Sequence, residues 1–151
     1  MKYLIGIFMM LNLMLSCDSS RVYEQFQAIP DFWSQNDTLS FDFKVKETGY
    51  YKITFHVRQS SEYRYNNFYY YYFLSSDSVL YDGLNEINFY DSKTGKPLGK
   101  GIGDLFDHRD EVLDSIELYP KKNYRFSILQ YMRKDSLTTI KRVGLRINTK
   151  A

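Results

Sequence analysis

Apolar and polar side chains alternate along most of the chain. In one early segment Leu39, Phe41, Phe43 and Val45 are separated by single polar residues. A period of two is typical of a β-strand that buries one face. The same pattern predicts further strands over residues 50–59, 67–76, 85–91, 115–120, 124–132 and 142–149.

The segments between these strands have turn compositions. Residues 92–97 (SKTGKP) place Gly95 where a positive φ is favoured. Residues 118–124 (LYPKKNY) have the spacing of a tyrosine corner, in which the Tyr124 hydroxyl bonds to backbone at the edge of a sandwich. Residues 103–114 could form one or two helical turns. We therefore expect an all-β fold, an immunoglobulin-like or jelly-roll-like β-sandwich of about seven to eight antiparallel strands with at most one short helix.

The first 16 residues have the composition of an export signal. Lys2 precedes a short apolar run that ends at Ser16, and this run is shorter than the roughly 20 residues that span a bilayer. Cys17, the only cysteine, follows at once. This junction resembles the lipobox of bacterial lipoproteins. The resemblance implies cleavage before Cys17, a diacylglyceryl group on its sulfur and a palmitate-type acyl chain on the new amino terminus. The alternative is an ordinary secretory signal with an incidental cysteine.

A lipid on Cys17 would explain a lone thiol in an exported protein, because a thioether cannot oxidise or form unwanted disulfides. Two or more acyl chains hold a protein stably on a membrane. We expect residues 1–16 to be a lipoprotein signal peptide, residues 17–35 a lipidated N-terminus and polar tether, and residues 36–151 the sandwich domain. The covalent lipid is the only non-protein group predicted, and no cofactor or metal is expected.

Composition and motifs argue against nucleic acid binding and familiar enzyme classes. The formal charge of +2 falls to +1 without residues 1–16, whose only charged side chain is Lys2, so no basic footprint is present. The KTG at 93–95 lacks the companion motifs of penicillin-binding enzymes, and GKPLGKG at 95–101 lacks Walker spacing. His56 alternates with Phe55 and Val57, which predicts a solvent-facing position. We expect no catalytic residue and no small-molecule substrate.

Acidic residues gather around His108. Such oxygen ligands could hold calcium, although the EF-hand spacing is absent. Their intervals of three and four also fit the solvated face of a short helix, which is the favoured interpretation. A weaker hypothesis is a hydrolase that uses this cluster. The residues concerned are Asp104, Asp107, Asp110, Glu111 and Asp114.

The most unusual feature is the tyrosine-rich segment EYRYNNFYYYYFLSS. On a strand, Tyr69 and Tyr71 face one side and Tyr70 and Tyr72 the other, and only one side can be core. The other pair either lies flat on the sheet or contacts a protein or sugar. Trp33 either contacts a partner or pins the tether to the sandwich. These five residues are the candidate partner-binding residues.

Several blocks together resemble the GldH family of gliding-motility lipoproteins from Bacteroidetes. They are CDSSRVYEQFQAIPDFW, YRYNNFYYYY, GKPLGKGIGD and LQYMRKDSL with IKRVGLRI. The tyrosine block departs from the family by its extra rings. The resemblance implies an envelope component needed for gliding, without enzymatic activity, associated with the type IX secretion and motility apparatus and destined for the outer membrane. The lipidated cysteine is the only functional residue of the family that the resemblance assigns to a position in this sequence, and that position is Cys17.

These observations favour a lipid-anchored accessory or scaffolding protein of the cell envelope. Its expected partners are the membrane, reached through the anchor, and other motility or secretion proteins. The alternative is a lipid-anchored carbohydrate-binding module. Coplanar exposed rings beside Asn66 and Asn67 would favour this alternative, whereas rings buried in the core would count against it.

Overall fold

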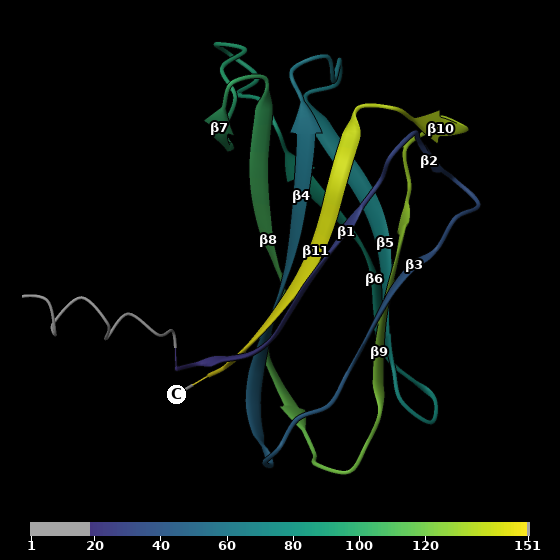
Figure 1. Cartoon of the computed structure of the whole chain (residues 1–151), viewed down its shortest axis with the longest axis vertical. Helices are drawn as coiled ribbons and strands as arrows, with labels where there is room; N and C mark the ends of the chain where they lie inside the picture. Colours follow the sequence, from purple (N-terminus) through teal and green to yellow (C-terminus); the bar gives the residue numbers. More distant parts are fainter. Residues whose placement is uncertain (1–18, 151) are drawn as a thin grey trace, which may run out of the picture.

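The alternating segments form long antiparallel strands in a computed structural model that describes residues 19–150 (Figure 1). No helix occurs in this part of the chain. The strands are β1 (Arg21–Ala28), β2 (Trp33–Ser34), β3 (Leu39–Phe43), β4 (Gly49–Ser60), β5 (Asn67–Ser75), β6 (Val79–Asn88), β7 (Lys100–Ile102), β8 (Leu105–Leu118), β9 (Tyr124–Gln130), β10 (Ser136–Leu137) and β11 (Ile140–Thr149).

Two sheets face each other across the core. The first sheet has the strand order β1-β11-β4-β8-β7, and the second has the order β3-β9-β5-β6. All their pairings are antiparallel. Figure 1 shows the two layers side by side, with the short β2-β10 ladder at one end. The predicted all-β sandwich is confirmed.

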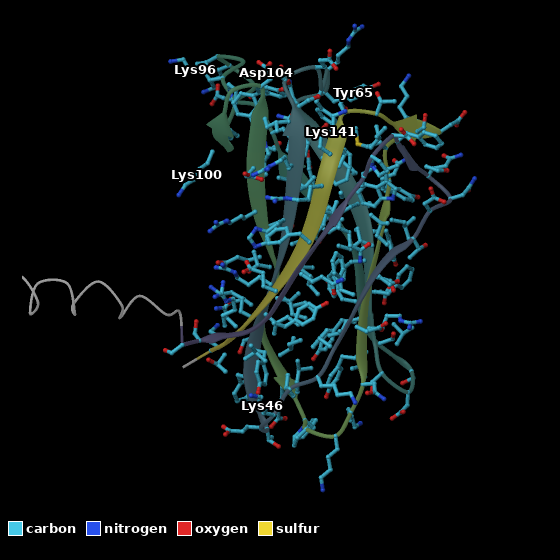
Figure 2. All side chains as sticks on the ribbon, in the orientation of Figure 1. Lys46, Tyr65, Lys96, Lys100, Asp104 and Lys141 are labelled. Atoms are coloured by element: carbon cyan, nitrogen blue, oxygen red, sulfur yellow. The ribbon has the colours of Figure 1, made fainter. Side chains whose placement is uncertain are left out.

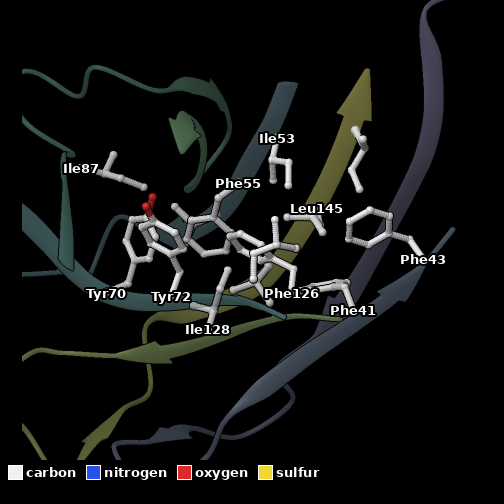
Figure 3. Packing of buried hydrophobic residues seen from close by; sticks show 14 of the residues in the cluster. Phe41, Phe43, Ile53, Phe55, Tyr70, Tyr72, Ile87, Phe126, Ile128 and Leu145 are labelled. Atoms are coloured by element: carbon white, nitrogen blue, oxygen red, sulfur yellow. The ribbon is translucent and has the colours of Figure 1, made fainter. Parts of the chain in front are cut away.

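Aromatic rings from the two sheets interlock in the core (Figure 3). The ring of Phe55 on β4 lies 4.7 Å, centroid to centroid, from that of Tyr70 on β5. Tyr72 stacks on Phe126 of the neighbouring β9 at 5.6 Å. Burying a side chain of this size stabilises the fold by about 1.5–3 kcal/mol. The alternation seen in the sequence is therefore the packing surface of the sandwich.

Two local predictions about backbone geometry are confirmed. The backbone N–H of Tyr119 donates to the Tyr124 hydroxyl at 2.8 Å, which is the tyrosine corner. Gly95 has a φ of 66° in the 92–97 turn. Both features fix the paths of connections between strands.

The possible helix over residues 103–114 is wrong, because most of this segment belongs to β8. His108 pairs with Val57 and Asp110 with Phe55, so both face inward, whereas Arg109 pairs with His56 on the outer face. The long ladder with β4 determines the conformation of this segment, because tertiary pairing overrides a weak local pattern such as the helical spacing of the acids. No helix in the described part of the chain is long and apolar enough to cross a membrane.

The expected polar tether is also wrong from Arg21 onward, because residues 21–28 form the edge strand β1. Glu24 pairs with Arg146 in the β1–β11 ladder and forms an ion pair with it at 2.8 Å. The Phe26 ring lies against His56 at a centroid distance of 5.6 Å. The segment looks polar in the sequence because an edge strand leaves much of its surface in solvent.

Gly144 on β11 provides the space that seats β1. A Cβ at this position would lie 2.2 Å from Cδ1 of Phe26, so we expect Gly144→Ala to push Phe26 off the sheet. The expected loss in unfolding free energy is about 1–3 kcal/mol, measured by urea denaturation. Gly49→Ala is the matched control, because its Cβ would meet Tyr51 at an ordinary 3.8 Å. Equal stability of the two variants would show that Phe26 does not hold β1 in place.

Candidate functional site

The tyrosine strand divides its rings between the two faces of the second sheet, as the alternation predicts. Tyr70 and Tyr72 are buried in the core. Tyr69, Tyr71 and Phe73 are half-buried on the outer face. Tyr70 and Tyr72 are therefore packing residues, and this half of the candidate set is unavailable to a partner.

Tyr70 also joins the two sheets through a polar contact. Its hydroxyl donates to the Asp110 carboxylate on β8, and Asn85 Nδ2 on β6 donates to Asp110 Oδ2 at 3.1 Å. Burial raises the pKa of Tyr70, with the hydrogen bond to Asp110 adding to the effect. The hydroxyl thus stays protonated and donates a hydrogen bond from the second sheet to the first.

Trp33 lies inside the domain with 1% of its surface exposed. Its Nε1 donates to the carbonyl oxygen of Asp37 at 2.9 Å, and its ring lies 5.9 Å from Phe68. The indole is buried and its N–H already has a hydrogen-bond acceptor, so the side chain is not available to contact a partner. Its position fits the alternative that it pins the N-terminal segment to the sandwich.

An aromatic face covers the outer side of the second sheet, and we define it by Tyr69, Tyr71, Phe73, Leu84 and Tyr131. Tyr71 pairs with Leu84 across β5 and β6. Its ring lies 4.9 Å from Phe73 and 6.4 Å from Tyr131. Tyr131 is 57% exposed and Leu84 is 49% exposed. Large side chains are thus presented to solvent from three adjacent segments.

A groove of about 420 Å³ runs beside this face. The lining includes two cationic side chains and no acidic one. Met132 is held there because its Sδ accepts a hydrogen bond from the Tyr69 backbone N–H at 3.2 Å. The lining residues are Tyr65, Tyr69, Leu84, Tyr131, Met132, Arg133 and Lys134. Only Tyr69 among them was a candidate from the sequence.

Tyr65 comes from the loop before β5 and belongs to the tyrosine-rich segment. The remaining contributors escape sequence reasoning because they come from β6 and from the loop after β9. The one signal for them is the YM pair at the end of LQYM, which places two large apolar residues just where the strand stops. Pairing of Tyr71 with Leu84 requires the β5–β6 register. A single strand pattern does not specify that register.

Two histidine side chains are buried. His56 is on the outer face of the first sheet, but Phe26 covers it, so the expected solvent exposure is wrong. His108 stacks on Phe89 at 4.2 Å. In both rings Nε2 lacks a hydrogen-bond partner, and desolvation lowers each pKa to about 4. Both rings are neutral at pH 7.

The acidic cluster is dispersed over strand β8 and its flanking turn. Asp107 accepts from Arg58 at 2.8 Å and from Arg142 at 3.5 Å, while Glu111 pairs with Lys52 and Asp114 with Lys150. The Arg58 contact lowers the Asp107 pKa. Asp104 lies in an exposed turn. Within residues 19–150, no three metal-ligating side chains converge on one point. Three of these acids thus form ion pairs with basic side chains, and the cluster does not form a helix face.

Cys17 precedes the described residues, so the predicted lipid attachment remains an expectation from the sequence.

Comparisons with known proteins find gliding-motility lipoproteins that are similar to this chain. A family model described as GldH lipoprotein matches residues 21–147. A gliding motility lipoprotein GldH homolog of Christiangramia forsetii is 27% identical over 147 residues, covering 87% of this chain and 86% of that protein. Gliding motility lipoprotein GldH of Flavobacterium johnsoniae is 23% identical over 150 residues, covering 91% of each.

Among solved structures, the infectious bursal disease virus VP2 subviral particle aligns with a TM-score of 0.40 and 13% identity. The alignment covers 88% of this chain and 34% of that one, and such a score is too low to establish a common fold.

Proposed function

This chain belongs to the GldH lipoprotein family, and from that premise we propose that it is a non-enzymatic docking component of the gliding motility and type IX secretion apparatus. Family membership makes it a membrane-anchored protein of the cell envelope. We assign its anchor to lipid on Cys17 and its location to the outer membrane. Its partners are other envelope proteins, without a nucleic acid, cofactor or small-molecule substrate.

The aromatic face is the observation that carries this proposal. Interfaces are enriched in Tyr and Met at their centres, because these side chains bury much area and adapt to the opposing surface. Here Tyr131 and Leu84 project from a rigid antiparallel sheet, and Met132 lines the adjacent groove. A cluster of this kind costs solubility if it remains in water, so a partner that covers it would stabilise the assembly.

The groove also favours a particular chemistry in the partner. Arg133 and Lys134 line it without an acidic neighbour in the lining. A partner segment that inserts an apolar side chain among the rings and places a carboxylate near these cations would satisfy both features. We therefore propose a protein segment with apolar and acidic side chains as the occupant.

Ring orientation supports a protein over a carbohydrate. The interplanar angle is 50° between Tyr71 and Phe73 and 49° between Tyr71 and Tyr131, so these rings do not form the flat platform that sugars stack on. Asn67 is already engaged, because its Nδ2 donates to Glu86 at 2.6 Å and to the Tyr69 hydroxyl at 3.2 Å. Both observations count against the glycan-binding alternative, which the purification experiment below would detect as recovery of polysaccharide.

Affinity purification from crosslinked cells tests this function. We expect motility or secretion subunits to co-purify with the C-terminally tagged chain and to be lost in Cys17→Ala. Tyr131→Ala combined with Leu84→Ala should lower their recovery about 30-fold or more, as expected for loss of an interface hot spot. Tyr50→Ala is the control, since Tyr50 is also 57% exposed but lies on the first sheet. Recovery of polysaccharide alone would contradict the proposal.

A further inference from the structure

The outer face of the first sheet carries an excess of positive charge. Strand alternation and register place these charged side chains together on the side opposite the core. The basic ones are Arg21, Lys52, Arg58, Lys100, Arg109, Arg142, Arg146 and Lys150, and the acidic ones are Glu24, Asp107, Glu111, Asp114 and Glu117.

Ion pairing leaves part of this charge uncompensated. Glu24 contacts both Arg21 and Arg146 at 2.8 Å, and Asp107 contacts both Arg58 and Arg142. One carboxylate therefore serves two guanidinium groups in each case.

Two exposed cations on this face have no acidic partner. Within residues 19–150, neither Lys100 nor Arg109 is within ion-pair distance of a carboxylate. Both side chains are exposed. Lys100 and Arg109 therefore add positive charge to the surface, and replacing them breaks no ion pair.

The outer face of the second sheet does not carry such an excess of positive charge. Its strands direct Asp42, Asp82 and Glu86 outward, with Arg125 as the counterion of Asp42. The same face carries the exposed aromatic side chains. Arg133 and Lys134 line the groove beside it. The sandwich therefore has one basic face and one aromatic face without a comparable excess of charge.

The chain reaches its anchor directly beside the basic face. The backbone N–H of Thr149 donates to the Ser20 carbonyl oxygen at 2.8 Å, and Asn148 Nδ2 donates to Ser20 Oγ at 2.8 Å. The chain is thus fixed to β11 at Ser20. Cys17 is three residues earlier, which limits the distance between the two Cα atoms to about 11 Å.

A basic hollow adjoins this exit point. It has a volume of about 540 Å³ and is lined by Ser20 together with Lys52, Arg109, Arg146 and Lys150, with Glu111 as the acidic lining residue. The lipid-bearing residue is therefore within one short segment of several cationic side chains.

We propose that the outer face of the first sheet rests on an anionic membrane surface and thereby directs the aromatic face toward protein partners. The inference rests on lipidation of Cys17, which belongs to the proposed function. The occupant is a lipid surface because the anchor leaves from the edge of this face and the charge is complementary. A short attachment keeps the cations that line the hollow beside Ser20 within about a Debye length of the headgroups, about 10 Å at 0.1 M salt.

Label accessibility on vesicles tests the orientation. The full lipidated chain has no free thiol, since the sulfur of its only cysteine carries lipid, so a single new cysteine takes a fluorophore selectively. Glu111→Cys reports on the basic face, Leu84→Cys on the aromatic face, and Lys46→Cys on the loop end of the sandwich, which Figure 2 shows far from Lys96. Acrylamide quenching is measured on phosphatidylcholine vesicles with and without phosphatidylglycerol.

We expect the label at position 111 to be protected relative to position 84 on the anionic vesicles. The protection should disappear on phosphatidylcholine alone and at about 1 M salt, where the Debye length is about 3 Å. Arg109→Glu combined with Lys100→Glu should lower the ratio of protected to unprotected molecules about fivefold or more.

Other outcomes separate the two proposals. Bound protein with equal quenching at positions 111 and 84, or with protection only at position 46, would overturn the orientation and leave the anchor intact. Failure of the purified chain to bind any vesicle, with the same result for Cys17→Ser, would overturn lipid anchoring and the orientation with it.

Discussion

Lowering the pH from about 7 to about 4.5 is expected to reduce the free energy of unfolding by about 4–6 kcal/mol. The cause is the pair of buried histidines. In the folded protein the pKa of His56 and that of His108 are both lowered to about 4, from an ordinary value of 6.5. Each group therefore contributes up to about 1.4 kcal/mol per pH unit between these two values, and less near either of them.

The sign follows from which state binds the proton. Well above pH 6.5 both rings are neutral in both states, and the free energy of unfolding does not depend on them. As the pH falls below that value, the two histidines bind protons in the unfolded chain but not in the folded chain, so the free energy of unfolding decreases. Burial excludes the charged form in both cases, and the nearby Arg109 adds repulsion at His56.

Urea denaturation at a series of pH values measures this loss. The expected slope between pH 6.5 and pH 5 corresponds to about two protons, and His108→Phe should reduce it to about one. Carboxylates such as Asp107 and Asp114 have lowered pKa values, so their contributions are lost below this window. A stability that is flat from pH 6.5 to pH 5 would show that the histidines are not buried as described.

Trp33→Ala is expected to lower the free energy of unfolding by about 3–5 kcal/mol. The indole is one of the largest fully buried side chains, and its removal leaves a cavity against Phe68. It also leaves the Asp37 carbonyl oxygen without the indole donor. Because β2 and β10 pair through Trp33 and Leu137, we expect this ladder to loosen with the core.

The adjacent residue provides the control for Trp33. Phe32 is 53% exposed, so Phe32→Ala should change stability by less than about 0.5 kcal/mol. Chemical denaturation of both variants, followed by far-UV circular dichroism, makes the comparison. A small effect at Trp33 together with a large one at Phe32 would mean that this segment contacts the sandwich through the opposite side chain.

The sequence pattern predicts the parts of the fold where one face of a strand is buried and the other is polar. Phe41 and Phe43 of β3, and Val143, Leu145 and Ile147 of β11, are buried as their alternation indicates. The tyrosine corner at Tyr124 was also predictable, because a short motif encodes a local hydrogen bond.

Strands without that contrast were not predictable. β1 is an edge strand whose Phe26 lies on the outer surface, so its pattern resembles a tether. The end of β8 lies in the strand predicted over 115–120, but its first ten residues alternate inward His108 and Asp110 with outward charges, so hydrophobicity gives no period of two there. Both strands form through long-range pairing with β11 or β4, which a single sequence does not specify.

The candidate site was predictable only in part, for a related reason. Strand geometry alone separates Tyr69 and Tyr71 from Tyr70 and Tyr72. Which pair faces the core depends on the register with β9, where Tyr72 pairs with Ile128. The groove is built from three segments that are distant in sequence, and its cations Arg133 and Lys134 follow the end of a strand. Such a site arises from topology and carries no contiguous motif.

Site-specific photo-crosslinking in living cells tests the docking claim most directly. A photoreactive amino acid is placed at Tyr131 on the aromatic face or at Tyr50 on the first sheet, two positions that are each 57% exposed. The account predicts a discrete adduct with a motility or secretion protein from position 131 and none from position 50. No adduct at position 131, or the same adduct at both positions, would contradict the assignment of the aromatic face as the docking surface.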